Sequence, residues 1–211
     1  MTNGCCGPVG TIGARIMSAM LRGAASQPIP RQATLGRGPL AGGMTRILAV
    51  ALLGGCAPEL DWREVRPSGT AVVALLPCKP QSLARSVSLA GRDLRLSMLA
   101  CKAGGLTWGL ASGDVGEPSH VMTVLEALRV SAVGNLQGVV TRSSGAAVRG
   151  ATPNEAQGLL EVRGRRPDGT VARGQFLLFA HGTQVFEVMV IGADLPDAAM
   201  ETYFGSVRVS P

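Results

Sequence analysis

Residues 171–192 read VARGQFLLFAHGTQVFEVMVIG, and this stretch decides the fold class of the chain. Two long, mostly apolar runs, 171–179 and 184–191, flank His181-Gly182-Thr183, a tripeptide typical of a turn. Strands joined by so short a connection must pair antiparallel. The stretch therefore predicts a long antiparallel hairpin.

The residues around this hairpin predict neighbouring elements. Residues 158–162 begin a strand, and RRPDGT at 165–170 favours a turn, because proline fixes one dihedral angle and glycine permits a positive φ. Downstream, residues 196–204 predict a short helix closed by Gly205, and residues 207–209 predict a last strand.

A longer helix is predicted to begin at Pro118, because proline is favoured in the first turn of a helix. Val121, Leu125 and Leu128 recur at helical spacing, and Gly134 stands where a C-terminal cap is expected. This helix divides the predicted strands into two groups.

Four strands are predicted before that helix, at residues 71–76, 85–89, 94–99 and 106–111. The second and third flank Gly91-Arg92-Asp93, a hairpin signal. The order is thus strands, helix, strands, helix and strand. It predicts an α+β domain in which one longer and one short helix pack on an antiparallel sheet.

The charge of the chain is unevenly distributed. The formal net charge is +6, but no acidic residue precedes Glu59, and five arginines give residues 1–55 a charge of +5. The remainder is nearly neutral and lacks the basic footprint that binding to a phosphate backbone requires. We therefore expect no nucleic-acid partner.

Residues 1–43 show no helical or strand period and contain no acidic or aromatic residue. Such a segment cannot bury enough apolar surface to fold. It is either a disordered extension or upstream sequence included by a start codon assigned too early. We favour the second interpretation because of the motif that follows.

Residues 44–56 read MTRILAVALLGGC, which is the layout of a secretory signal. Its apolar run is too short to span a membrane. The end of the run, Leu53-Gly54-Gly55-Cys56, resembles a bacterial lipobox. The resemblance implies a signal peptide over residues 44–55 and lipidation of Cys56. A buried strand that ends in cysteine is the alternative, and an upstream start is also open because the signal is short for its class.

The mature chain is expected to have two parts. Residues 56–69 contain Pro58 and Pro67 among polar side chains and predict a tether, and residues 70–211 form the α+β domain. The charge, the signal and the tether together predict a small protein held on a membrane by its N-terminus.

Three stretches of the domain resemble a known fold: VVALLPCKP at 72–80, GGLTW at 104–108, and the turn, hairpin, helix and strand of 164–209. They are similar to the PsbP-like α/β fold, named for an extrinsic protein of photosystem II and shared by short proteobacterial lipoproteins. The resemblance implies an antiparallel sheet with two helices. It implies no reaction, because the fold family has no common activity.

Cys78 and Cys101 are the two thiols that remain in the mature chain once Cys56 is lipidated, since Cys5 and Cys6 lie outside the domain. In an oxidising envelope such a pair favours a disulfide, worth about 3 kcal/mol through loop closure. Two buried free thiols are the alternative. A metal site is disfavoured because two cysteines leave a tetrahedral ion short of ligands.

The remaining polar residues form no catalytic motif. His120 and His181 have no acidic or thiol neighbour at ligand spacing and are expected to be solvated. Ser143 and Ser144 are assigned to a loop without the nucleophile motif of hydrolases. We therefore expect neither an enzyme nor a metal or cofactor.

Charged residues on the predicted strands are interpreted as surface. Glu161 and Glu187 alternate with apolar neighbours and are placed on the wet face of the sheet. Arg163, Arg165 and Arg166 are interpreted as a solvated hairpin end, with an anionic partner as the alternative. The expected core aromatic residues are Trp108, Phe176, Phe179, Phe186, Tyr203 and Phe204.

The sequence favours a periplasmic lipoprotein, anchored through Cys56, that acts as a non-enzymatic binding or assembly module. Its expected partners are the membrane, through the acyl chains, and an envelope protein. Ala57, where aspartate is absent, favours the outer membrane. The alternative is a small-ligand or lipid carrier that uses a cleft between sheet and helix.

Overall fold

The structure, a computed structural model, describes residues 59–210. Its larger sheet contains β3 (Gln81–Leu89), β4 (Arg92–Ala103), β5 (Leu106–Asp114), β6 (Val139–Ser144), β7 (Gly158–Arg165), β8 (Val171–His181) and β9 (Gln184–Gly192). A smaller sheet contains β1 (Arg63–Val65), β2 (Val72–Leu76) and β10 (Arg208–Val209). The helices are the 3-10 turn η1 (Pro118–His120), α2 (Val121–Asn135) and α3 (Asp197–Ser206).

Every pair of neighbouring strands in the two sheets is antiparallel. The strand order is β3-β4-β5-β9-β8-β7-β6 in the large sheet and β1-β2-β10 in the small one. The predicted hairpin is the pair β8 and β9, and it lies inside the large sheet. There it pairs Phe179 with Phe186, whose rings stack with centroids 4.8 Å apart. The predicted α+β class and the two helices are confirmed.

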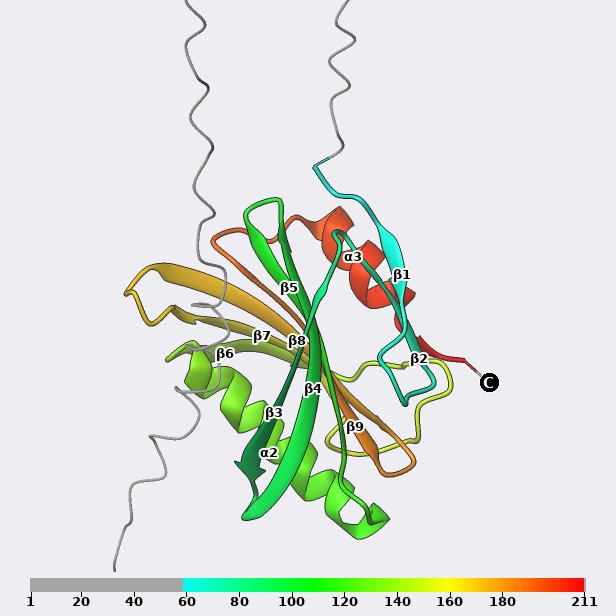
Figure 1. Ribbon diagram of the computed structural model, residues 1–211. Helices are drawn as coiled ribbons and strands as arrows, with labels where there is room; N and C mark the ends of the chain where they lie inside the picture. Colours follow the sequence, from blue (N-terminus) through cyan, green and yellow to red (C-terminus); the bar gives the residue numbers. More distant parts are fainter. Residues whose placement is uncertain (1–58, 211) are drawn as a thin grey trace, which may run out of the picture.

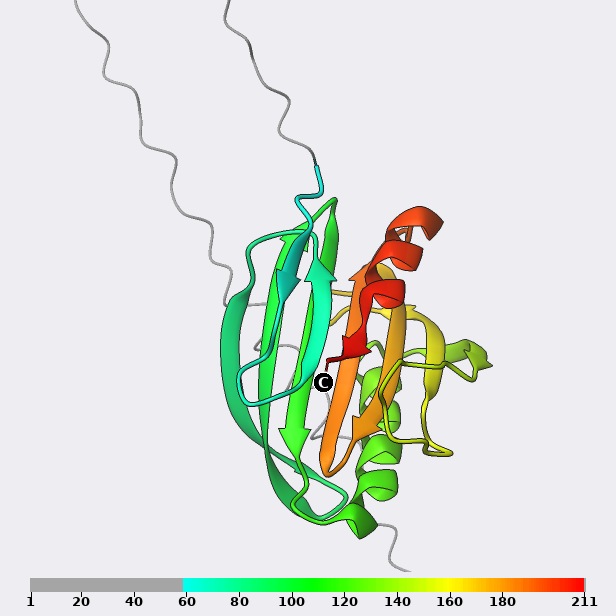
Figure 2. The same ribbon diagram turned by 90° about the vertical axis from the view of Figure 1, so that its right-hand side faces the viewer.

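The large sheet carries a separate hydrophobic core on each face. Helix α2 crosses one face, where Val124, Leu125 and Leu128 are buried against the sheet (Figure 1). Helix α3 and the small sheet cover part of the other face, as the view turned by 90° shows (Figure 2). Strands β5, β8 and β9 contribute side chains to both cores, so they form the centre of the domain.

The domain begins earlier than predicted. Strand β1 lies inside the segment assigned to the tether, residues 56–69, and pairs with β2 through Val65 and Ala74. Val65 is buried and Trp62 packs against the same core. The tether interpretation was wrong for this part because a three-residue strand is too short to show a period in sequence. Cys56 and residues 1–55 lie outside the described residues.

Two further local predictions were wrong. The residues expected to form a loop around Ser143 and Ser144 form β6, whose six side chains are all exposed. An edge strand without a buried residue has no alternating pattern to detect. The turn between β3 and β4 is centred on Ala90 and Gly91, whose φ angles are 51° and 74°, and not on Gly91-Arg92-Asp93. Two successive positive φ angles suit a tight hairpin turn.

Within residues 59–210, no helix has the length and apolar character needed to cross a bilayer.

Candidate functional site

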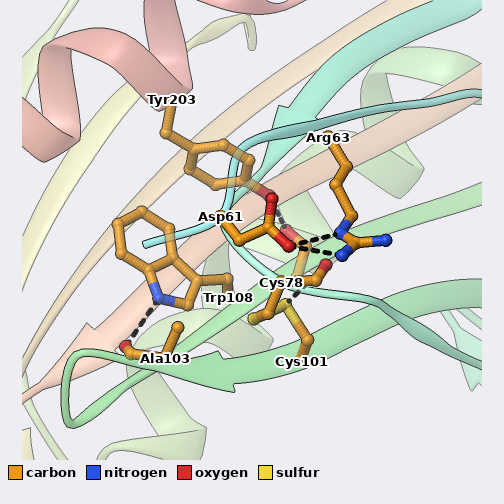
Figure 3. Close-up of a disulfide and its surroundings, with 8 residues drawn as sticks. Asp61, Arg63, Cys78, Cys101, Ala103, Trp108 and Tyr203 are labelled. Atoms are coloured by element: carbon orange, nitrogen blue, oxygen red, sulfur yellow. Dashed lines mark hydrogen bonds and ion pairs between the residues drawn. A yellow bond between two sulfur atoms is a disulfide. The ribbon is translucent and has the colours of Figure 1, made fainter. Parts of the chain in front are cut away.

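The predicted cysteine pair forms a disulfide between the two sheets. Cys78 follows β2 and Cys101 lies in β4, and their Cα atoms are 6.0 Å apart. The bond therefore ties the small sheet to the large one (Figure 3). The two residues are 23 positions apart, so closing this loop in the unfolded chain stabilises the domain by about 3 kcal/mol.

An aromatic cluster lies beside the disulfide. Trp108 contacts Trp62 and Tyr203 edge to face, with ring centroids 5.7 and 5.2 Å apart. Both polar tips are satisfied internally: the Tyr203 hydroxyl donates to the carbonyl of Gly109 over 2.8 Å, and Trp108 Nε1 donates to the carbonyl of Ala103 over 3.1 Å. Figure 3 shows Trp108 and Tyr203, with their two hydrogen bonds, beside the disulfide.

This cluster is a structural site. Trp108 and Tyr203 are fully buried, and burial raises the pKa of the Tyr203 hydroxyl well above its ordinary value. The Tyr203 hydroxyl is thus removed from solvent, and its proton is engaged within the domain. The predicted core positions of the aromatic residues are confirmed, except that Phe204 is only partly buried.

The two glutamates of the sheet occupy opposite faces. Glu187 pairs with Ala111 and Leu178, which belong to the core under α2, and directly opposed residues share a face. Its carboxyl is half-buried, and desolvation raises its pKa from 4.5 to about 7. The prediction that Glu187 lies on a wet face was wrong, because Glu187 lies on the face of the sheet that α2 covers.

Glu161 lies on the opposite face, in a groove of about 340 Å³ over β6, β7 and β8. Three arginines line this groove together with Glu161 and Asp197. They are Arg142, Arg163 and Arg173. We call this feature the arginine groove. One of its arginines, Arg142, lies 3.7 Å from the Glu161 carboxylate.

Sequence reasoning found only one arginine of this groove. The sequence grouped Arg163 with Arg165 and Arg166, but neither of those two lines the groove. Arg165 is the last residue of β7, and its guanidinium donates to the carbonyl of Gly169 in the turn that follows. The signal for Arg173 was present, because Arg163 and Arg173 are placed symmetrically about the turn and therefore pair across the hairpin.

The histidines are not assembled into a reactive site. His120 Nε2 lies 3.1 Å from the Arg92 guanidinium, and His181 Nδ1 lies 3.0 Å from the carbonyl oxygen of Gly150. Among residues 59–210, no group of three or more histidine, cysteine or acidic side chains is arranged to hold a metal ion.

A second cavity, of about 270 Å³, lies where the β3–β4 hairpin meets the start of α2. Its lining includes Asp93, Asp114 and the apolar Val124. The pKa of Asp114 is held below its ordinary value by a hydrogen bond from the backbone N–H of Gly116 and by Thr183. This carboxylate therefore has hydrogen-bond partners in its own turn and in the β8–β9 turn.

Comparison with known proteins provides no family. No protein-family model matches the chain, and no curated protein matches it.

Proposed function

We propose that this protein is a lipoprotein of the bacterial envelope, held on the periplasmic side of a membrane by acyl chains on Cys56. Its domain acts as a binding or assembly module and carries out no reaction. The disulfide between Cys78 and Cys101 carries the proposal, because such bonds persist in oxidising compartments and are rare in the cytosol. Ala57 favours the outer membrane as the location.

The proposed anchor, Cys56, is close to the domain along the chain. Three residues separate Cys56 from Leu60, which already packs on the domain at Gly104. Four residues of chain extend over at most about 14 Å. An acylated Cys56 therefore holds the β4–β5 turn near the headgroups, and this short reach favours a partner within the membrane or on its surface. The PsbP-like resemblance is consistent with such a module.

Metabolic labelling with a radioactive fatty acid tests the proposal in a bacterial host. The full chain should incorporate label, and Cys56→Ala should abolish it. The matched control is Cys5→Ala/Cys6→Ala, which should keep the label because these thiols precede the lipobox. Label in the Cys56→Ala variant equal to that in the unmodified chain would show that the lipobox interpretation is wrong.

The compartment is tested separately by thiol counting. Protein taken from the envelope should expose no thiol at Cys78 or Cys101 to alkylation until it is denatured and reduced. Alkylation of both residues in the native exported protein would contradict the proposed compartment.

A carrier of a small ligand is the second candidate, and the cavity at the start of α2 favours it. At about 270 Å³ it is slightly smaller than typical ligand pockets, so its occupant would be small. Native mass spectrometry of the purified protein should then show a co-purifying mass. Val124→Trp should remove that mass by filling the cavity, whereas Val130→Trp on the exposed side of α2 should retain it. A native mass spectrum that shows only the mass of the protein would exclude the small-ligand carrier.

A further inference from the structure

Four neighbouring side chains lie on the face of the sheet that is opposite α2. Strand pairing sets Val139 against Arg163, Arg163 against Arg173, and Arg165 against Val171. Because directly opposed residues share a face, and residues two apart on one strand also do, these side chains project to the same side. We call Val139, Arg163, Val171 and Arg173 the β6–β8 patch.

The patch combines exposed apolar and basic groups. Val139 and Val171 are 66% and 55% exposed. Val139 lies opposite Arg163, and Val171 lies two positions from Arg173 along β8, so each valine is next to one of the two arginines. Single exposed apolar residues are common on protein surfaces. Two exposed valines next to two arginines on one sheet face instead resemble the apolar and cationic mixture that suits the interfacial region of a bilayer.

The two arginines of the patch are poorly neutralised. Cross-strand pairs of like charge are destabilising, so Arg163 and Arg173 repel one another. Arg173 lies 3.8 Å from Asp194, but that carboxylate is 91% exposed and the pair is therefore weak. Among the described residues, no carboxylate comes within 4 Å of the Arg163 guanidinium.

An anion would relieve this repulsion, and the arginine groove offers space for it. The groove holds about 340 Å³ and has one more arginine than carboxylates in its lining. Glu161 is already engaged with Arg142, so its charge is partly offset. Guanidinium groups bind carboxylate and phosphate oxygens with two parallel hydrogen bonds, and phosphate is the anion that a phospholipid surface presents.

A series of packing contacts connects the groove to the end of the domain where the chain enters. Leu60 packs against Gly104 in the β4–β5 turn, and Leu106, which follows that turn, packs on Gly192 at the end of β9. The loop after β9 then supplies Leu195 to the groove lining. Figure 1 shows the β4–β5 turn and the β9–α3 loop at the same end as the start of β1.

We propose that the β6–β8 patch docks on the bilayer that holds the anchor, with Arg163 and Arg173 binding the phosphate of an anionic phospholipid and Val139 and Val171 entering the interfacial region. This inference rests on the proposed envelope location, since it requires that end of the domain to face a membrane. Docking fixes the orientation of the domain, so that α2 and its side of the sheet point away from the lipid.

Vesicle binding tests the docking independently of lipidation. The full chain carrying Cys56→Ala is mixed with vesicles of phosphatidylglycerol and phosphatidylcholine, or of phosphatidylcholine alone, and bound protein is measured by sedimentation. We expect binding to the anionic vesicles. Each basic residue near an anionic surface contributes on the order of 1 kcal/mol, so R163Q/R173Q should weaken binding roughly 25-fold.

The matched control is R92Q/R95Q, which removes the same charge from exposed positions of β4 that lie outside the groove and at the β3–β4 end of the strand, away from the β4–β5 turn. It should weaken binding less than about threefold, and residues 1–58 are the same in every variant, so their contribution is constant. Equal losses in the two double variants, or no binding to anionic vesicles, would overturn the proposal. Because Cys56 is absent throughout, these outcomes are independent of whether the native protein is lipidated.

A local measurement distinguishes the membrane from free phosphate. Hydrogen exchange of β6 and of the 166–170 turn should slow with anionic vesicles and remain unchanged with millimolar inorganic phosphate alone. The exchange in R163Q/R173Q should respond to neither. Equal protection by inorganic phosphate would assign the groove to a soluble phosphate compound and overturn the membrane proposal.

Discussion

The face of the large sheet opposite α2 contains two regions of opposite character. Over β5 and β9 it is sealed by α3, the small sheet and the disulfide, and Trp108 and Tyr203 are fully buried there. Over β6, β7 and the start of β8 it is open, with exposed arginines and valines. Side chains in the closed region are buried and stabilise the fold. Side chains in the open region are exposed and contribute little to its stability. The open region is therefore where a binding function is expected.

The largest effect is expected from Trp108→Ala in the closed region. Removing a fully buried indole should reduce the free energy of unfolding by about 3–5 kcal/mol, because lost burial and a residual cavity add together. Urea denaturation measures this loss. Trp62→Ala is the control, since Trp62 is only partly buried, and it should cost less than half as much. Equal costs would show that Trp108 contributes no more to the closed region than its partly buried neighbour does.

Breaking the disulfide should have the next largest effect. Cys78→Ala/Cys101→Ala should reduce the free energy of unfolding by about 3 kcal/mol. The reason is that the unfolded chain regains the conformational entropy that the bond removes by joining two residues 23 positions apart. Reduction of the unmodified protein should reproduce the loss, whereas the double variant should be insensitive to reductant. A melting temperature unchanged on reduction would mean that the bond does not constrain the unfolded chain.

Glu187 should make stability depend on pH from the opposite, α2-covered face. Its pKa is about 7 in the folded domain and near the ordinary 4.5 in the unfolded chain, so the folded state binds the extra proton between these values. The contribution of Glu187 to the free energy of unfolding should therefore be greatest below pH 4.5. It should fall by roughly 2–3 kcal/mol as the pH rises through 7.

Glu187→Gln isolates this contribution. The variant should lose the fall in stability between pH 4.5 and 8 in chemical denaturation, and should be more stable than the unmodified protein at pH 8. Glu126→Gln on the exposed side of α2 is the control and should keep the original profile. Superimposable profiles for the unmodified protein and Glu187→Gln would contradict the desolvation of this carboxyl.

The smallest effect on stability is expected in the open region. Arg163→Gln should change the free energy of unfolding by less than about 0.5 kcal/mol, because the side chain is exposed and its cross-strand partner is also an arginine. Urea denaturation and vesicle binding of the same Arg163→Gln variant should show that this side chain serves membrane binding and does not stabilise the fold. A loss above 1 kcal/mol would place Arg163 among the residues that hold the fold together.

Local patterns in the sequence predicted most of the regular elements. The 171–192 hairpin and the helix after Pro118 carry strong periods, and the structure contains both. Strands β1 and β6 were missed because one is three residues long and the other buries nothing. The cysteine pair was recognisable from compartment and number alone, and the Cα separation of 6.0 Å agrees with it.

The sequence by itself determined the fold class, the hairpin partners and the pairing of the two domain cysteines, since each depends on neighbours along the chain or on covalent chemistry. Only the tertiary structure decided which face each charged residue occupies. Alternation within each strand placed both Glu161 and Glu187 on a wet face, whereas the strand register and the position of α2 put them on opposite faces, one covered and one open. The covering elements come from distant parts of the chain, so burial, the raised pKa of Glu187 and the arginine groove arise from contacts that no local pattern contains.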